Sequence, residues 1–218
     1  MIGKLWQSFL NLLYPPRCPA CRTSVESHGA WCRDCLRQVW APRHIALALH
    51  NLRWLDDCYV LCEYRAGVQT LIRNMKFRSV MRHGPHLAWL ISQASLDRFG
   101  PVDAVIPVPL SAERLAVRGF NQTEAIFRPW TEAAGLMWQE ALTRSRDTLP
   151  QWELTLKERR ANLKGAFAVR EGADLGGRRL LVVDDIFTTG ITMDEAARVL
   201  KKGGAARVTG LALASGAR

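Results

Sequence analysis

Residues 180–192 read LLVVDDIFTTGIT, and this stretch decides the fold of the chain. Four consecutive apolar residues, Leu180 to Val183, predict a buried central strand of a parallel sheet that is covered on both faces. Asp184 and Asp185 follow where we expect the strand to leave the sheet, and a loop of threonine and glycine then leads into a helix. Ligands of open α/β sheets bind at the carboxyl ends of such strands, so the stretch predicts a ligand site.

The loop after the two acids suits a phosphate group, because backbone N–H groups and the helix dipole favour an anion at a helix start. Gly190 lets the backbone approach a ligand closely, and the hydroxyls of Thr188, Thr189 and Thr192 add donors. The two carboxylates then face the hydroxyls of the ligand, or a metal ion. A sugar phosphate with free ribose hydroxyls meets these requirements. The alternative is an acid or a threonine that only caps the helix.

Strands alternate with helices along the chain, which predicts an α/β fold with a mostly parallel sheet flanked by helices. The expected strands are residues 57–64, 103–110, 167–169, 179–184 and 207–213. The expected helices are residues 68–77, 86–99, 123–135 and 193–202. The polar, basic stretch 143–160 is either a mobile lid over the ligand site or an ordinary surface loop. We expect one domain in residues 1–50 and a second in residues 51–218.

The 218-residue chain carries 30 Lys and Arg against 20 Asp and Glu, a formal net charge of +10. This balance predicts an anionic partner, which is a nucleic acid, a phosphorylated metabolite or an acidic membrane surface. Hydrophobic residues make up 48% of the chain, a fraction that argues against intrinsic disorder. No apolar run reaches the length of a transmembrane helix, so we expect no transmembrane segment.

The first 14 residues carry apolar side chains at helical spacing and predict a short amphipathic helix that packs on the rest of the protein. The apolar positions are Leu5, Trp6, Phe9, Leu10 and Leu13. A helix that touches a membrane surface is the alternative. A signal peptide fits less well, because polar residues break the apolar run and no small-residue cleavage site follows.

Two Cys-x2-Cys pairs, Cys18 with Cys21 and Cys32 with Cys35, are separated by ten residues. Without an export signal we expect a reducing compartment, in which disulfides are a poor explanation for the pairs. Two residues between thiols let both sulfurs turn towards one metal ion, and two such knuckles form a tetrahedral four-thiolate shell for structural zinc. An iron centre and a redox dithiol remain as alternatives.

The other two cysteines, Cys58 and Cys62, stand among apolar residues of an expected strand and are predicted to be core residues. His28 lies close to the four-cysteine set in the sequence. Because four thiolates already complete a zinc shell, we expect His28 to be a solvent-facing loop residue.

Residues 180–192 resemble the phosphoribosyl pyrophosphate (PRPP) motif of type I phosphoribosyltransferases. Three further segments narrow the resemblance to one family. The first is IPVPL at 106–110 with RGFNQ at 118–122, and the second is PPRCPAC at 15–21. The third is TRSR at 143–146, followed by Gln151, Leu154, Arg159, Asn162 and GAF at 165–167. Together with the PRPP motif they resemble the ComF family, which includes GntX-like DNA-utilisation proteins, over nearly the whole chain.

The resemblance implies a cytoplasmic bacterial protein with an N-terminal zinc module and a phosphoribosyltransferase-type domain. By the resemblance, Asp184 and Asp185 bind the ribose hydroxyls of PRPP with Mg²⁺, and the loop with Thr188, Thr189, Gly190 and Thr192 cradles its 5-phosphate. One four-cysteine set implies one zinc ion rather than two. A role in natural transformation, the DNA-uptake machinery as a partner and association with the inner face of the inner membrane are family expectations.

Two more segments are candidates for the pyrophosphate of the ligand. The loop with Pro107, Val108 and Pro109 follows a neighbouring strand, where this fold holds pyrophosphate, and the prolines favour a rigid or cis turn. A plain turn that ends the strand is the alternative. Lys76 lies on a basic segment and is predicted to reach the diphosphate, although a solvated charge on a helix is the simpler interpretation.

Arg118, Asn121 and Gln122 precede an expected helix and are candidates for contacts with phosphate or base, with a helix cap as the alternative for Asn121. In the stretch 143–160 and just after it, the candidate lid residues are Arg159, Arg160 and Asn162.

Two classes of function are compatible with these residues. The first is a phosphoribosyltransferase that transfers the phosphoribosyl group of PRPP to a nitrogen base. No local motif identifies that base. The second is a protein that holds a nucleotide or single-stranded DNA, by stacking bases on aromatic residues such as Trp152 beside basic ones. A regulator that senses PRPP is a third possibility, and the sequence contains no recognisable helix-turn-helix.

Overall fold

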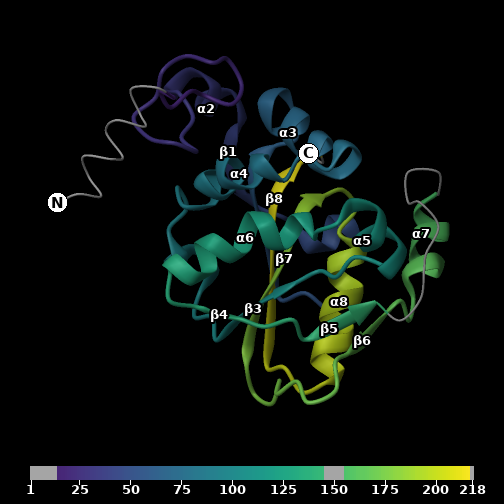
Figure 1. The fold of residues 1–218 in the computed structure, drawn as a ribbon. Coiled ribbons are helices and arrows are strands. Elements are labelled where there is room, and N and C mark those ends of the chain that lie inside the picture. Colours follow the sequence, from purple (N-terminus) through teal and green to yellow (C-terminus); the bar gives the residue numbers. More distant parts are fainter. Residues whose placement is uncertain (1–13, 145–154, 217–218) are drawn as a thin grey trace.

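The computed structural model describes residues 14–144 and 155–216 (Figure 1). Residues 1–13, which hold all but the last residue of the expected amphipathic helix, fall outside the described residues, as does Trp152. Helix α7 contains Arg159, whose side chain is also outside the described part.

A six-stranded sheet in the order β1-β2-β8-β7-β3-β4 forms the centre of the protein (Figure 1). Its strands are β1 (Trp40–His44), β2 (Asp57–Glu63), β8 (Arg207–Ser215), β7 (Arg179–Phe187), β3 (Ala104–Pro107) and β4 (Met137–Trp138). All neighbouring pairs are parallel except β1 and β2, which are antiparallel. The mostly parallel α/β fold is confirmed. Strand β1 also brings residues on both sides of position 50 into one sheet.

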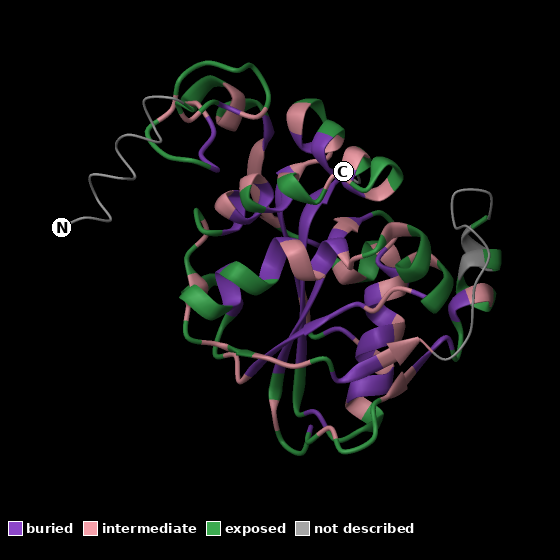
Figure 2. Ribbon diagram, in the orientation of Figure 1, coloured by how far each residue is buried: buried purple, intermediate pink, exposed green. Residues whose placement is uncertain are grey.

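Helices cover both faces of the sheet, so its central strands are buried (Figure 2). Leu181 and Val183 of β7 pack in one hydrophobic cluster with residues of α3 (Ala66–Arg78), α4 (Gly84–Ile91) and α6 (Gln122–Ala133). Leu180 and Val182 point to the opposite face, where they pack with α8 (Ile191–Lys202). This alternation explains why the strand reads as a continuous apolar run.

Strand β7 runs further than the sequence predicts, because it continues through both acids to Phe187. On one side, the ladder with β8 extends to Phe187, which pairs with Ser215. On the other side, β3 pairs with β7 only as far as Pro107, which lies opposite Val183. The two acids therefore lie in the part of β7 that still pairs with β8 but no longer pairs with β3.

The expected helix 86–99 is wrong in extent, since α4 ends at Ile91 and a separate 3-10 turn, η3 (Leu96–Phe99), follows. Just after α4, the Ser92 hydroxyl and the Gln93 amide both donate to the carbonyl of Trp89. Side chains that bond a helical carbonyl in this way compete with the backbone and favour a helix end.

The stretch 143–160 is not one continuous loop, because its ends belong to regular elements. Thr143 and Arg144 belong to β5 (Leu142–Arg144), which pairs antiparallel with β6 (Phe167–Val169) in a separate two-stranded sheet. The last residues of the stretch begin α7 (Leu156–Leu163), which Thr155 and Glu158 start with a capping box.

The remaining elements are short. They are α2 (Arg33–Val39), α5 (Ala112–Arg118) and the 3-10 turns η1 (Leu47–His50) and η2 (Met81–His83). Every peptide bond in the described part of the chain is trans, so the cis alternative for the Pro107 loop does not hold. None of the described helices has the length and apolar character of a membrane span.

Candidate functional site

Asp185 is 2% exposed, and its Oδ1 accepts a hydrogen bond from the ammonium of Lys76 at 2.9 Å. Lys76 belongs to the last turns of α3, so the pair joins that helix to the end of β7. The other oxygen, Oδ2, is also buried and has no hydrogen-bond partner among the described residues. An unpaired buried carboxylate oxygen is costly, which indicates a place for a ligand hydroxyl, a water molecule or a cation.

Asp184 is half-buried beside it. Its Oδ1 accepts hydrogen bonds from the backbone N–H of Asp185 at 2.8 Å and from the hydroxyl of Thr123 at 3.4 Å. Burial and the neighbouring charge of Asp185 raise the pKa of Asp184 to about 7, although Lys76 opposes the shift.

Arg118 brings a second cation to the acids. Burial lowers the pKa of its guanidinium, whereas the charge of Asp185 raises it, so the two groups are within electrostatic reach. One guanidinium nitrogen donates to Oε1 of the buried Gln122, while Nε is buried without a partner in residues 14–144 and 155–216. The structure thus brings Lys76, Arg118 and Gln122 together at the carboxyl end of β7.

Asn121 is the N-cap of α6, since its Oδ1 accepts from the backbone N–H of Thr123 at 3.0 Å. Its amide nitrogen also donates to the carbonyl of Val108 at 3.4 Å, and the Val108 N–H donates to the carbonyl of Val183 at 3.0 Å. Asn121 therefore joins the loop after β3 to the start of α6, next to the acids of β7.

The loop from Phe187 to α8 passes through Gly190, whose φ of +76° lies in the left-handed region. A Cβ at Gly190 would lie 2.5 Å from Leu52 and 2.7 Å from the Phe187 ring, so only glycine fits there without rearrangement. Thr188 is exposed and Thr189 is half-buried, and the 12-residue helix α8 starts immediately after the loop. A helix start of this kind favours an anion through the helix dipole.

A neighbouring segment supports this loop. Oδ1 of the buried Asp194 in α8 accepts hydrogen bonds from the backbone N–H groups of residues 53–55, at 2.8–3.3 Å. Arg160 of α7 donates to the carbonyls of His50 and Asn51, each at 3.0 Å. The contacts of Arg160 thus hold this segment in place, while Asn162 is half-buried further along α7.

The sequence analysis did not identify Tyr64 and Thr123 as residues of the candidate ligand site. Tyr64 follows β2 at the same edge of the sheet and is half-buried. Burial raises the pKa of its phenol, Lys76 opposes this shift and Asp185 adds to it, so the phenol is within electrostatic reach of both. Its position as the last residue of an expected strand was the signal that could have found it, because carboxyl ends of parallel strands meet at one edge.

The four sulfurs of Cys18, Cys21, Cys32 and Cys35 lie within 4.8 Å of one another. Tetrahedral zinc with bonds of about 2.3 Å holds its sulfurs about 3.8 Å apart, so the cluster fits this metal. Cys58 and Cys62 are fully buried on β2 and His28 is exposed, as the sequence predicts.

Comparisons with known proteins agree with this arrangement. Residues 9–45 match the double zinc ribbon domain family, and residues 140–217 match the phosphoribosyl transferase domain family. DNA utilization protein YhgH of Salmonella typhimurium strain LT2 is 32% identical over 219 residues, which cover 90% of this chain and 96% of the relative. Competence protein F of Haemophilus influenzae Rd is 30% identical over 196 residues, covering 86% of this chain and 79% of the relative. The chain belongs to the ComF family.

Other matches of this ComF-family chain are partial. DNA utilization protein YhgH of Escherichia coli O157:H7 is 41% identical over 107 residues, which cover 49% of this chain and 46% of the relative. A solved structure described as the allosteric regulatory enzyme of purine biosynthesis is 23% identical, with a TM-score of 0.38. That match covers 58% of this chain and 24% of the other.

The zinc ribbon match supports structural zinc at the four-cysteine cluster of this ComF-family chain. The matched family is named a double zinc ribbon domain. In this chain, however, residues 9–45 contain only four cysteines. The other two cysteines of the chain are the buried pair on β2. The cysteines thus suffice for one four-thiolate site.

Proposed function

We propose that this chain binds PRPP, or a related ribose 5-phosphate, together with Mg²⁺ at the carboxyl end of β7. The observation that carries the proposal is the buried Oδ2 of Asp185, which lacks a partner among the described residues, beside a glycine loop at a helix start. In this proposal Asp184 and Asp185 accept hydrogen bonds from the ribose hydroxyls. The loop with Thr188, Gly190 and the start of α8 holds the 5-phosphate.

The pyrophosphate of the ligand meets Lys76 and Arg118 in this proposal. Both cations lie within reach of Asp185, and both come from helices that follow strands at the same edge of the sheet. Carboxylate and hydroxyl oxygens are ligands that Mg²⁺ prefers, and a bound ion would neutralise the diphosphate. Lys76 then releases Asp185 and donates to a phosphate oxygen instead.

A bound PRPP reacts by group transfer when a nitrogen nucleophile is present. The C1–O bond to pyrophosphate breaks, the C1–N bond forms, and the nucleophile loses its proton to solvent or a base. The protein contributes positioning and charge stabilisation, without a covalent intermediate. Lys76 and Arg118 stabilise the departing negative charge, while the acids hold the ribose.

The process that we propose for this chain is DNA uptake or DNA utilisation in the cytoplasm, near the inner face of the inner membrane. Support comes from the names of its relatives, which speak of DNA utilization and of competence. Components of the DNA-uptake machinery are the protein partners expected in such a process.

Isothermal titration of the zinc-loaded protein with PRPP and Mg²⁺ tests the ligand. We expect binding by the wild type and at least a tenfold loss in Asp185→Asn, because the amide is uncharged and presents an N–H group to the ribose hydroxyl. Asp174→Asn is the control, since Asp174 is an exposed acid in an ion pair with Arg178 on the surface. Wild-type protein that does not bind, or Asp185→Asn that binds as tightly as the control, would overturn the proposal.

A second candidate function, binding of single-stranded DNA, is favoured by one face of α3. Phe77 is 74% exposed there, Arg73 lies one turn before it, and the exposed Arg78 and Arg82 follow. Bases stack on exposed aromatic rings, and arginines beside the ring attract the phosphates. Arg160 of the candidate lid, by contrast, donates to the backbone carbonyls of His50 and Asn51.

A further inference from the structure

Helix α3 connects the zinc module to the candidate ligand site. Its first turn packs against the segment that contains the four cysteines, and its last turns carry Lys76, which contacts Asp185. Gly67 and Lys76 are nine positions apart, a distance of about 14 Å along a helix axis. A single rigid element therefore has one end at each site.

The contact at the first end is very close. A Cβ at Gly67 would lie 2.8 Å from the Cβ of Ala20 and 2.8 Å from the ring of Trp31. Ala20 stands between Cys18 and Cys21 in the chain, and Trp31 directly precedes Cys32, so the metal ligands set the position of both contact residues. The start of α3 thus rests on residues that the zinc knuckles hold in place.

Two more bonds fasten this junction. The Arg65 guanidinium, just before α3, donates to the carbonyl of Gln38 in α2 at 2.8 Å. The indole N–H of Trp31 donates to the carbonyl of His86 in α4 at 2.9 Å. Ala66 has a φ of +46°, a conformation that an alanine adopts only where its surroundings impose it.

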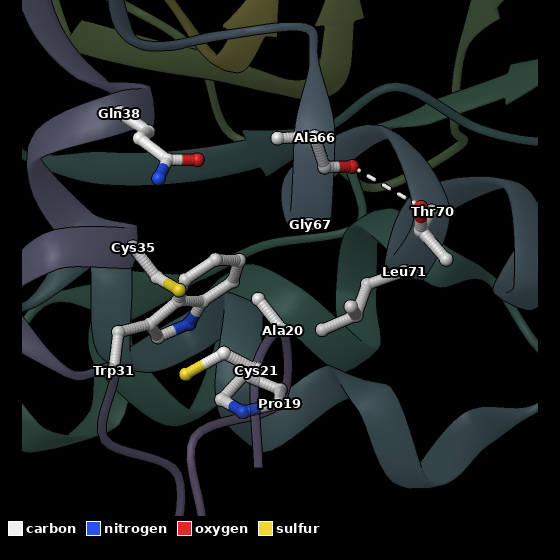
Figure 3. A pocket seen from close by; sticks show the side chains of 10 residues that line it. All are labelled: Pro19, Ala20, Cys21, Trp31, Cys35, Gln38, Ala66, Gly67, Thr70 and Leu71. Carbon is white, nitrogen blue, oxygen red and sulfur yellow. Dashed lines mark hydrogen bonds between the residues drawn. The ribbon is translucent and has the colours of Figure 1, made fainter. Parts of the chain in front are cut away.

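A cavity of about 330 Å³ lies at this junction, and Figure 3 shows the side chains that line it. Trp31, Cys21 and Cys35 line it from the zinc module, and Gly67 and Thr70 line it from α3. Because the cavity interrupts the packing here, fewer contacts besides that of Gly67 hold the start of α3. A change in the knuckles can therefore shift the first turn of α3, while buried residues such as Ile72 and Met75 hold the rest of the helix against the sheet.

We propose that the zinc module positions Lys76 at the ligand site through α3, so that the two sites are energetically coupled. Loss of zinc relaxes the contact of Gly67 with Ala20 and Trp31, displaces α3, and weakens the hold of Lys76 on Asp185. Bound PRPP in turn stabilises the zinc site, because coupling between two binding sites is reciprocal. This inference has a structural half, the effect of zinc on α3 and Lys76, and a ligand half, the effect of zinc on PRPP binding. Only the ligand half rests on the proposed function.

Hydrogen–deuterium exchange of the full chain tests the structural half without any ligand. Zinc is removed with a zinc-selective chelator while Mg²⁺ stays in excess, and exchange is followed by mass spectrometry. We expect faster exchange in residues 66–78 and also in residues 184–190. Lys76→Met should abolish the effect of zinc on residues 184–190. Changes confined to residues 14–44, or an unaltered effect in Lys76→Met, would overturn the coupling.

Titration with PRPP and Mg²⁺ tests the ligand half on the same samples. Zinc removal should weaken binding about tenfold, and saturating PRPP should raise the zinc affinity, measured in competition with a chromophoric chelator, by a similar factor. Gly67→Ala should weaken PRPP binding while the zinc content stays at one ion, and Thr70→Ala in the same cavity should not. Equal affinities with and without zinc would contradict the coupling. Wild-type protein that does not bind PRPP would contradict the proposed function alone, and the exchange measurement then decides the coupling.

Discussion

The ammonium of Lys76 lies 2.9 Å from a carboxylate oxygen of Asp185, although 109 positions separate the two residues in the chain. The Asp185 side chain is 3% exposed and that of Lys76 is 22% exposed, so water screens this ion pair only weakly. The pair ties α3 to the central strand β7 at the edge of the sheet where the candidate ligand site lies.

Removing the cation is expected to affect both stability and binding. Lys76→Met leaves a buried carboxylate without its partner, which should lower the free energy of unfolding by about 3 kcal/mol in urea titrations. PRPP should bind more than about tenfold more weakly in isothermal titration, because a phosphate loses a charged donor. Lys202→Met, at an exposed position of α8, is the control. Unchanged stability and affinity in Lys76→Met would show that the pair is not important.

Gly190→Ala should destabilise the loop before α8. The substitution combines a left-handed φ with a Cβ only 2.5 Å from Leu52, so we expect a loss of about 3 kcal/mol and of PRPP binding. Gly172→Ala is a matched control, since Gly172 has a φ of +77° and open space around the missing Cβ. Chemical unfolding of both variants separates the strain of the positive φ, which both share, from the clash with Leu52, which only Gly190→Ala has. Equal losses in the free energy of unfolding would contradict the packing argument.

Thiol alkylation should distinguish the two groups of cysteines. Burial and the charge of Asp57 raise the pKa of Cys58 to about 12, and burial and the charge of Glu63 raise that of Cys62 to about 12. Both thiols therefore stay protonated and inaccessible at pH 7.5, where the thiolate is the reactive form. Iodoacetamide with mass spectrometry should modify four of the six cysteines after zinc removal. Labelling of Cys58 or Cys62 in the folded protein would contradict this assignment.

Phe77→Ala should weaken the binding of single-stranded DNA about tenfold if the exposed face of α3 stacks bases. Fluorescence anisotropy with a labelled oligothymidine at several salt concentrations measures this, and affinity should fall steeply with salt. Leu49→Ala is the control, because Leu49 is 81% exposed on η1 and is not aromatic. The same affinity in both variants would remove Phe77 from the DNA contact.

Several elements of the fold could be predicted because their signals are local. The apolar run 180–183 indicates a strand buried on both faces, and the repeated Cys-x2-Cys spacing indicates a four-thiolate site. The predicted length of β7 was wrong, because its ladder with β8 continues to Phe187, beyond the point where the neighbouring β3 stops at Pro107. Helix 86–99 was wrong as well, because hydrogen bonds of Ser92 and Gln93 end α4 early.

The sequence by itself determined the mostly parallel sheet, the zinc ligands and the acidic pair with its glycine loop, because each depends on neighbours within a short stretch of chain. Only the tertiary structure decided which distant groups meet the acids. Lys76, Tyr64 and Arg118 reach Asp185 through strand order and helix packing, which bring separate parts of the chain to one sheet edge. Likewise, the contact of Gly67 with Trp31 depends on how α3 packs against the zinc module, a relation that residue spacing alone does not contain.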